Sequence, residues 1–351
     1  MTARYHADAL QTMARDLLLA AGLDAAPAVS VARTLCDGDL LGHDTHGLAL
    51  LAPYLREIEQ GRMARSGQPK EINAKPAAML WDGQRLPGPW LMELALDRMI
   101  PAARNFGLSS MVIRRSHHIA CLAVYLMRVA DEGMLGIVAC SDPNTASVAP
   151  FGGTRAVMTP NPIAIGFPTS SGPVLIDISA SITTNGMTNR LKQAGQLGAH
   201  PWWLDAQGQP TRDPAAFFTQ PPGTLLPLGG LDAGHKGYGL AMLIEAMTGG
   251  LAGHGRADRV EGWGATVCLQ LWDPAAFAGT AAFTGQTDWI VDACHRSAPR
   301  DPAVPVRVPG ERGLARKREQ LDHGLALHGS ILPALAPWAD RLAVALPPPA
   351  G

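Results

Sequence analysis

Two histidines, a carboxylate and a hydroxyl fall within the short segment Gly42-His43-Asp44-Thr45-His46-Gly47. Imidazole both gives and takes a proton near neutral pH, because its ordinary pKa lies closest to neutrality among the side chains. The segment therefore predicts a site of proton transfer. The alternative interpretation is a helix end, in which Asp44 or Thr45 is the cap and both histidines lie on the surface.

Further segments carry polar groups next to apolar runs that we expect to be buried strands, and each follows its strand except the one at Thr159, which precedes it. A carboxylate in such a place costs free energy unless it is paired or meets a ligand. The alternative is a helix cap for Ser116 and turn chemistry for the segments at Asp142 and Thr159. The segments are Ser116-His117-His118, Asp142-Pro143-Asn144, Thr159-Pro160-Asn161-Pro162 and Ile176-Asp177-Ile178-Ser179-Ala180-Ser181.

The pair His235-Lys236 follows a glycine-rich run, Leu226-Pro227-Leu228-Gly229-Gly230, and precedes a helix expected from about Tyr238. A lysine at the start of a helix combines its own charge with the positive end of the helix dipole. The pattern therefore predicts an anion site, with a plain glycine-rich turn as the alternative.

Composition limits the class of protein. The chain has 351 residues, 47% of them apolar, and a formal net charge of -1. A near-neutral chain argues against nucleic acid or an anionic membrane as an obligate partner. The five cysteines form neither a disulfide framework nor a CxxC pair. Neither a signal core at the N-terminus nor an apolar run long enough to span a bilayer is present, so we expect a cytoplasmic protein.

Hydrophobic periodicity predicts helices in the first sixty residues and in the tail, with strands and helices alternating between them. The expected helices cover 8–21, 27–42, 47–61, 91–100, 119–130, 238–248, 311–325 and 334–346. The expected strands cover 111–113, 135–140, 163–167, 174–176 and 265–269, and 195–222 is expected to be loop.

This order predicts an α/β (α+β layered) fold with a discontinuous helical domain built from both termini. The N-terminal helical part is expected at 1–73 and the α/β core, which binds cofactor and substrate, at 74–308. The C-terminal helices at 309–346 should pack on the N-terminal ones. Residues 347–351 are expected to be a disordered tail, because Pro347-Pro348-Pro349 ends the last helix.

Several nucleotide and catalytic motifs are missing: the chain has no GxGxxG, GxxxxGK[ST], GxSxG or HExxH. A Rossmann site, a P-loop, a hydrolase nucleophile elbow and a zincin are therefore disfavoured. No metal site is predicted. A metal-dependent hydrolase built on His43, Asp44 and His46 is a further alternative.

In their order and spacing these segments resemble the malate/L-lactate dehydrogenase-like oxidoreductases. That family also holds ureidoglycolate dehydrogenase, sulfolactate dehydrogenase, diketogulonate reductase and piperideine-carboxylate reductase. The resemblance runs from the first helix to Pro309-Gly310-Glu311. Its most specific pieces are Asp44-Thr45-His46-Gly47, Asn161-Pro162, Asp177-Ile178-Ser179-Ala180-Ser181, the Leu-Pro-Leu-Gly-Gly run and His235-Lys236-Gly237-Tyr238-Gly239-Leu240.

The resemblance implies an NAD- or NADP-dependent enzyme with a non-Rossmann core that works as a homodimer. It implies His46 as the proton donor and acceptor, Thr45 where the family usually has Ser, and His118 as a second active-site histidine. We add Asp142 as a catalytic-site residue and Asn161 and Arg190 as substrate residues. The implied cofactor residues are Ile176, Asp177, Ile178, Ser179, Ala180, Ser181, His235, Lys236, Pro309, Gly310 and Glu311.

Some positions depart from the family pattern, and these departures concern the substrate. Leu50 stands where an Arg is common, Asp142 stands where an Asn is common, and the family's usual Ser-Asn-His-Phe-Gly reads here Ser116-His117-His118-Ile119-Ala120. We predict reversible hydride transfer between NAD(P) and C2 of a small 2-oxo or 2-hydroxy acid. The alternatives are a cyclic imino acid (piperideine or pyrroline carboxylate) reductase and a non-catalytic nucleotide-binding protein.

Overall fold

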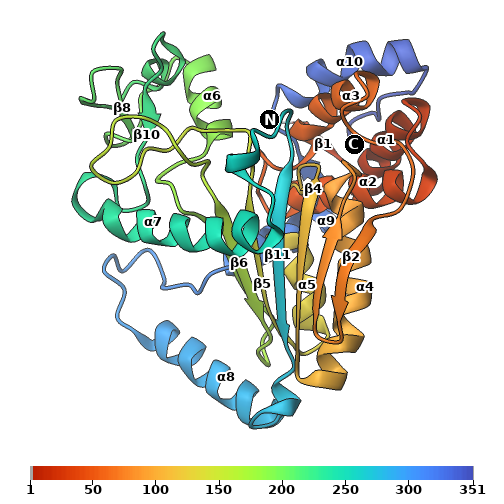
Figure 1. Cartoon of the computed structure of the whole chain (residues 1–351), viewed down its shortest axis with the longest axis vertical. Coiled ribbons are helices and arrows are strands. Elements are labelled where there is room, and N and C mark those ends of the chain that lie inside the picture. The colour runs from red at the N-terminus through yellow and green to blue at the C-terminus, as the bar shows by residue number, and fades with distance from the viewer. Residues whose placement is uncertain (1–2, 351) are drawn as a thin grey trace.

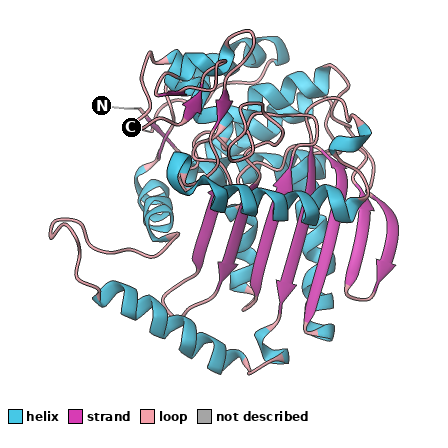
Figure 2. Ribbon diagram, turned by 60° about the vertical axis from the view of Figure 1, so that its left-hand side comes forward, coloured by secondary structure: helices cyan, strands magenta, loops and turns pink. Residues whose placement is uncertain are grey.

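A seven-stranded sheet forms the centre of the computed structural model, which describes residues 3–350. Its strand order is β2-β3-β4-β11-β5-β6-β7, and each neighbouring pair in it is antiparallel except β3 and β4. Helices cover both faces of the sheet and gather at one end of it (Figures 1 and 2). The predicted mixed α/β class is confirmed.

The strands of this sheet differ in length and burial. They are β2 (Lys70–Lys75), β3 (Ala78–Asp82), β4 (Leu108–Ser116), β5 (Leu135–Ser141), β6 (Pro162–Phe167), β7 (Val174–Ser179) and β11 (Ala265–Trp272). Two small sheets lie outside it. They hold β1 (Arg4–Tyr5) with β12 (Leu325–Ala326), and β8 (Trp203–Leu204) between β9 (Pro210–Thr211) and β10 (Thr224–Leu225).

The helices are α1 (Ala7–Ala20), α2 (Ala25–Leu40), α3 (Leu51–Glu59), α4 (Gly88–Phe106), α5 (Ala123–Asp131), α6 (Asn185–Gln193), α7 (Gly230–Glu245), α8 (Thr280–Arg296), α9 (Glu311–His323) and α10 (Ile331–Leu342). A π-turn at Ala246–Gly250 extends α7. Among the described residues, no helix has both the length and the apolar character needed to cross a bilayer.

The main core lies between the sheet and the pair α4 and α5. Leu96 and Met99 of α4 and Leu126 of α5 are buried there against Val267 and Leu269 of β11. The opposite face is covered by α7, which runs across the strands in Figure 1. Both faces of β5 and β11 are therefore buried, which explains their nearly continuous apolar sequence.

A second core joins the two ends of the chain. Leu10, Leu17 and Leu18 of α1 lie at helical spacing on its buried face and share one cluster with residues of α2, α3 and α10, including Leu335. The amide of Ala350 donates to the carbonyl of Arg4 at 2.7 Å. The domain boundaries and the disordered tail stay predictions.

Several predicted elements differ from the observed ones. The helix expected from 119 begins at Ala123, because Ala120 adopts a left-handed φ of 59° and interrupts the helical backbone. The helix expected from Tyr238 begins at Gly230, so His235 and Lys236 lie inside it. The structure also contains β2, β3, α6 and α8, which the sequence did not predict.

Candidate active site

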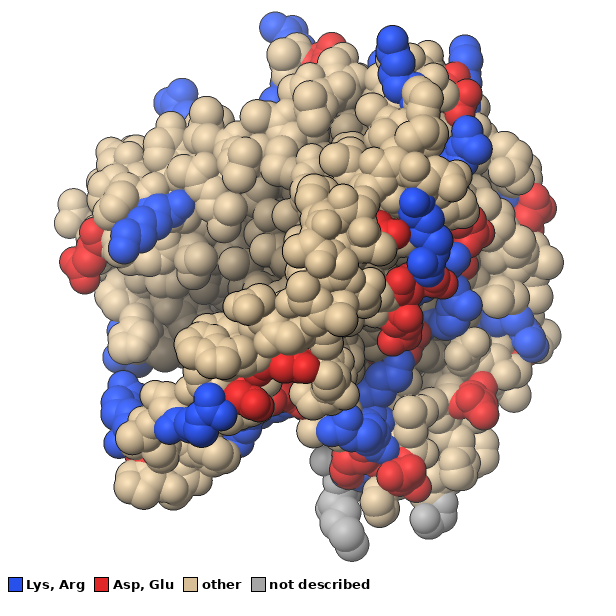
Figure 3. Space-filling model, turned by 90° about the horizontal axis from the view of Figure 1, so that it is seen from below, with Lys and Arg blue, Asp and Glu red and all other residues tan. Residues whose placement is uncertain are grey.

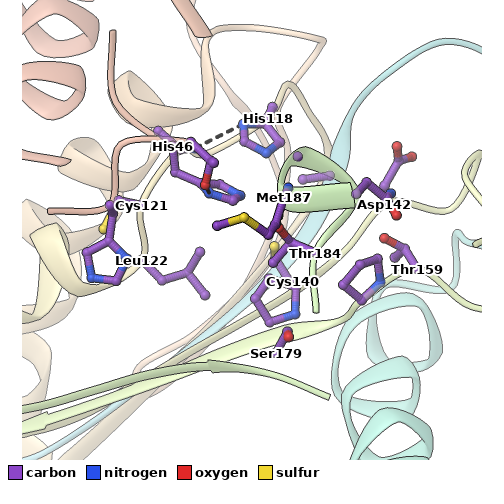
Figure 4. A pocket seen from close by; sticks show the side chains of 18 of the residues that line it. His46, His118, Cys121, Leu122, Cys140, Asp142, Thr159, Ser179, Thr184 and Met187 are labelled. Atoms are coloured by element: carbon purple, nitrogen blue, oxygen red, sulfur yellow. Dashed lines mark hydrogen bonds between the residues drawn. The ribbon is translucent and has the colours of Figure 1, made fainter. Parts of the chain in front are cut away.

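A cavity of about 520 Å³ opens where the ends of β5, β6 and β7 meet the turn after α2 (Figure 4). Six separate segments line it. They contribute His43, Thr45, His46 and Leu50; His118, Ala120, Cys121 and Leu122; Cys140, Asp142 and Thr145; Thr159, Pro160 and Pro162; residues 177–179 and 182–187; and residues 263–265.

His46 and Thr45 act as a unit within this cavity. The Thr45 hydroxyl lies 2.9 Å from Nδ1 of His46. If this hydroxyl donates to Nδ1, the proton of the neutral ring stays on Nε2. Burial lowers the pKa of His46, while the carboxylates of Asp177 and Asp44 work in the opposite direction. The result is a half-buried imidazole that binds a proton weakly and can release it.

His118 lies against His46, with ring centroids 5.9 Å apart and planes inclined by 25°. Its Nδ1 lies 2.9 Å from the Tyr54 hydroxyl and accepts the Ala120 backbone N–H at 3.2 Å. Because a backbone N–H can only donate, the neutral ring carries its proton on Nε2. Burial, with the nearby His46 and His117, holds the pKa of His118 well below its ordinary value.

His117 does not line the cavity, although it stands next to His118 in the chain. Its ring is fully buried, with Nε2 3.4 Å from the Glu57 carboxylate. Burial lowers the pKa of His117 to about 4. Glu57 in turn pairs with Arg62 at 2.6 Å. His117 therefore fills the space behind the site.

Asp142 lines the cavity and also organises its own turn. The Thr145 hydroxyl and the Asn144 backbone N–H donate to its two oxygens at 2.6 and 3.0 Å. Burial raises the pKa of the Asp142 carboxyl, and these hydrogen bonds work against that shift. Both interpretations of Asp142, turn residue and cavity residue, therefore have a basis in the geometry.

The predicted cofactor segments fall into two groups. Asp177, Ile178 and Ser179 line the first cavity, and Asp177 and Ile178 also border an adjoining one of about 500 Å³. Ile176, Pro309 and Gly310 line that second cavity. Ala180 and Ser181 are buried beneath the first, whereas Glu311 pairs with His295 at 2.6 Å.

The structure does not bring the other predicted residues to the cavity wall. His235 and Lys236 are exposed on α7. Asn161 is buried and donates to Glu245 at 3.0 Å. Arg190 forms an ion pair with Asp44 at 2.8 Å. Their roles stay predictions.

Sequence reasoning missed the segment 182–187, which forms one side of the cavity. Thr184 caps α6 by accepting the Met187 N–H at 3.1 Å. A Thr-Asn pair is a common helix start, so that signal was present. The helix itself buries only Thr188 and shows no apolar stripe.

Asp39 is a buried carboxylate that stabilises the turn carrying His43 and His46 through a hydrogen bond. Its carboxylate accepts the Leu48 N–H at 2.6 Å and is almost fully buried. Burial raises the pKa of Asp39 from 3.8 to about 7. The folded chain therefore binds this proton more tightly than the unfolded chain does.

Between pH 3.8 and about 7 the fold should lose stability from this group as the pH rises. The full loss is at most about 4 kcal/mol. Asp39→Asn lacks this falling contribution, so its free energy of unfolding should increase relative to that of the parent as the pH rises over this range, measured by urea unfolding at several pH values. Asp322→Asn, at an exposed position of α9, should keep the parent profile. The parent profile itself also contains contributions from His46, His117 and His118, whose lowered pKa values make stability rise with pH. The test is therefore the difference between variant and parent, and a difference that stays constant over this range would contradict the assignment.

Comparison with known proteins agrees with this geometry. The family model for malate/L-lactate dehydrogenase matches residues 5–336. A (2R)-3-sulfolactate dehydrogenase (NADP(+)) of Chromohalobacter salexigens is 33% identical, with 94% of this chain and 96% of that protein covered. A Δ(1)-pyrroline-2-carboxylate reductase of Ancylobacter novellus is 28% identical, with 95% and 96% covered.

The fold agrees as well. The crystal structure of malate dehydrogenase from Entamoeba histolytica superimposes with a TM-score of 0.92 at 23% identity, covering 99% of this chain and all of that one. The family resemblance predicted from the sequence is thereby confirmed. The chain belongs to the malate/L-lactate dehydrogenase family and is an oxidoreductase.

Proposed function

We propose that the enzyme catalyses reversible hydride transfer between NAD or NADP and C2 of a small 2-oxo or 2-hydroxy acid. The observation that carries this proposal is the pair His46 and His118, which lie face to face on a cavity that also holds Asp177. When bound, the nicotinamide cofactor supplies or accepts the hydride. His46 protonates the substrate oxygen during reduction and takes that proton back during oxidation.

The residues present fit such a cofactor. The two cavities of about 520 and 500 Å³ share His43, Asp177 and Ile178, so together they form an elongated space. The exposed Arg312 and Arg316 line the second cavity. Guanidinium groups bind phosphate oxygens well, which supports placing the phosphate end of the dinucleotide there. This arrangement supports a core that binds the cofactor without a glycine fingerprint.

A nicotinamide absorbance assay tests the proposal directly. The purified chain should oxidise NADH or NADPH with at least one small 2-oxo acid of a panel that includes pyruvate and oxaloacetate. A cyclic imino acid belongs in the panel, because the Asp142 carboxylate in the cavity could meet an imino group. Cofactor binding without any turnover would instead favour the non-catalytic alternative.

The charge of the cavity should set the substrate preference. Leu50 and Asp142 line it, so it carries an anion and lacks one expected cation. A second substrate carboxylate near an ionised Asp142 costs on the order of 1 to 4 kcal/mol. We expect higher kcat/KM for pyruvate than for oxaloacetate, and a shift toward oxaloacetate in Asp142→Asn. Asp131→Asn, exposed at the end of α5, should leave the ratio unchanged. A parent preference for oxaloacetate that survives in Asp142→Asn would contradict the charge argument.

An exposed apolar surface supports a homodimer. Leu231, Met242 and Leu243 of α7 are 47 to 52% exposed. Seen from below, the molecule has a hollow on one side and wide areas without charged side chains (Figure 3). Light scattering should give twice the chain mass. A Met242→Glu/Leu243→Glu variant should be monomeric, because the charges oppose burial of α7. Leu321→Glu, at a similarly exposed position of α9, should stay dimeric. A parent chain that is monomeric in solution would refute the proposal that this surface of α7 forms a dimer interface.

The five cysteines are free in the structure, and four of them are buried. Free thiols are typical of a reducing compartment. This supports the predicted cytoplasmic location.

A further inference from the structure

Three side chains that the proposed proton transfer does not use meet where the two cavities join. They are His43 in the turn after α2, Cys121 in the loop before α5, and Asp177 on β7. One ring nitrogen, the thiol sulfur and one carboxylate oxygen all lie within 4.8 Å of one another. Figure 4 places Cys121 beside Leu122 at the edge of the pocket.

These distances are close to those of a tetrahedral metal centre. Zn²⁺ binds thiolate sulfur at about 2.3 Å and nitrogen or oxygen at about 2.0 to 2.2 Å, so its ligand atoms stand roughly 3.3 to 3.6 Å apart. The Cys121 sulfur already lies 3.7 Å from Oδ2 of Asp177. Closing the remaining gap needs only small side-chain shifts.

The side chains of the cluster also have few hydrogen-bond partners, and there is room beside them for a fourth ligand. The Ala123 backbone N–H donates to Oδ2 of Asp177 at 2.9 Å and holds that carboxylate in place. Within residues 3–350, the other oxygen of Asp177 and both ring nitrogens of His43 form no hydrogen bond. His43 and Asp177 border both cavities, so a water molecule can reach the same point.

We propose that His43, Cys121 and Asp177 form a binding site for a thiophilic divalent cation, best matched by Zn²⁺. A soft thiolate with an imidazole and one carboxylate selects Zn²⁺ or Co²⁺ over Mg²⁺ and Ca²⁺, which prefer oxygen ligands alone. Binding replaces the S–H bond of Cys121 by a metal–sulfur bond and releases the proton to solvent, with no change of oxidation state. Burial raises the pKa of this thiol, so affinity should increase with pH.

The site has a consequence for activity, and this part rests on the proposed function. Asp177 belongs to the segment assigned to the nicotinamide cofactor, so the cation and the cofactor compete for the same space. Zn²⁺ should therefore inhibit the enzyme reversibly, and excess cofactor should relieve the inhibition.

A cobalt titration tests the site without reference to activity. Co²⁺ added to the chelator-treated full chain should bind one ion per chain and produce a thiolate-to-cobalt absorption band, which Zn²⁺ should remove. The band should be lost in Cys121→Ser, and His43→Asn should weaken binding more than roughly tenfold, since even loss of a supporting group costs that much. Cys140→Ser removes another buried, cavity-lining thiol outside the cluster and should keep the band.

The outcomes separate the two parts of the proposal. Absence of the band in a folded parent chain, or its persistence in Cys121→Ser, overturns the site. Circular dichroism shows whether each variant is folded. If Cys121→Ser does not fold, the loss of binding in His43→Asn tests the site in its place. A thiolate-bound metal that leaves cofactor binding unchanged, measured by NADPH fluorescence, overturns the competition alone. Because the titration needs no turnover, failure of the proposed function would not hide either result.

Discussion

Replacing His46 with alanine should lower turnover by about two to four orders of magnitude, the usual contribution of a general acid and base. The ring is the group in the cavity that pairs with the Thr45 hydroxyl and lies over His118. Cofactor affinity should change little, because Asp177 and the second cavity stay intact. Stopped-flow or steady-state assays with NADH and NADPH measure the effect on turnover.

His200→Ala is the matched control for this variant, because His200 is exposed in a loop far along the chain. It should keep the activity of the parent. If His46→Ala turned over substrate at a near-parent rate over the whole pH range, the central assignment would be wrong. A fall in cofactor affinity that accounts for the whole loss would point to a binding role instead.

Gly47→Ala should damage both stability and turnover, although it adds only a methyl group. A Cβ at Gly47 would lie 2.4 Å from Cγ and Oδ2 of Asp39, the buried carboxylate beneath the turn. Overpacking of this kind costs about 1 to 3 kcal/mol. Relief of the clash has to move the turn that carries His46, and a misplacement of about 1 Å can lower turnover by roughly a hundredfold.

Gly285→Ala provides the comparison, since Gly285 lies in the middle of α8 and a methyl group added there would have nothing within 4 Å. Alanine is the better helix former, so this variant should be neutral or slightly stabilised. Urea unfolding of both variants measures the change in stability, and kcat measures the change in turnover. Equal stability and equal kcat for Gly47→Ala and the parent would show that the turn tolerates a side chain.

The sequence by itself determined the elements that bury a regular apolar pattern. The stripe of Leu10, Met13 and Leu17 predicts α1, and the apolar runs of β5, β6 and β11 predict the middle of the sheet. The prediction of the helix succeeds because burial of one face follows directly from spacing along the chain. The strands succeed because burial of both faces leaves a continuous apolar run. The class and the family also followed from local sequence, through Asp44-Thr45-His46-Gly47 and the segments after the strands.

Elements with little burial could not be predicted in this way. All six residues of β2 are exposed, and α8 buries only Val291, so neither shows a period that separates strand, helix and loop. The start of α7 was misplaced for a related reason. Its glycines usually weaken a helix, but Gly237 lies so close to the backbone of Leu228 and Ala180 that a side chain would not fit.

Within the site, contacts between residues adjacent in sequence could be predicted, whereas contacts between residues far apart in sequence could not. Thr45 and His46 are adjacent, so their hydrogen bond follows from local geometry. The ion pair of Arg190 with Asp44 and the cluster of Cys121 with Asp177 join residues far apart in sequence. These distances are set by the packing of β7 and α6 against the turn after α2. The sequence specifies the chemical type of each side chain, but the tertiary structure determines which distant residue lies beside it.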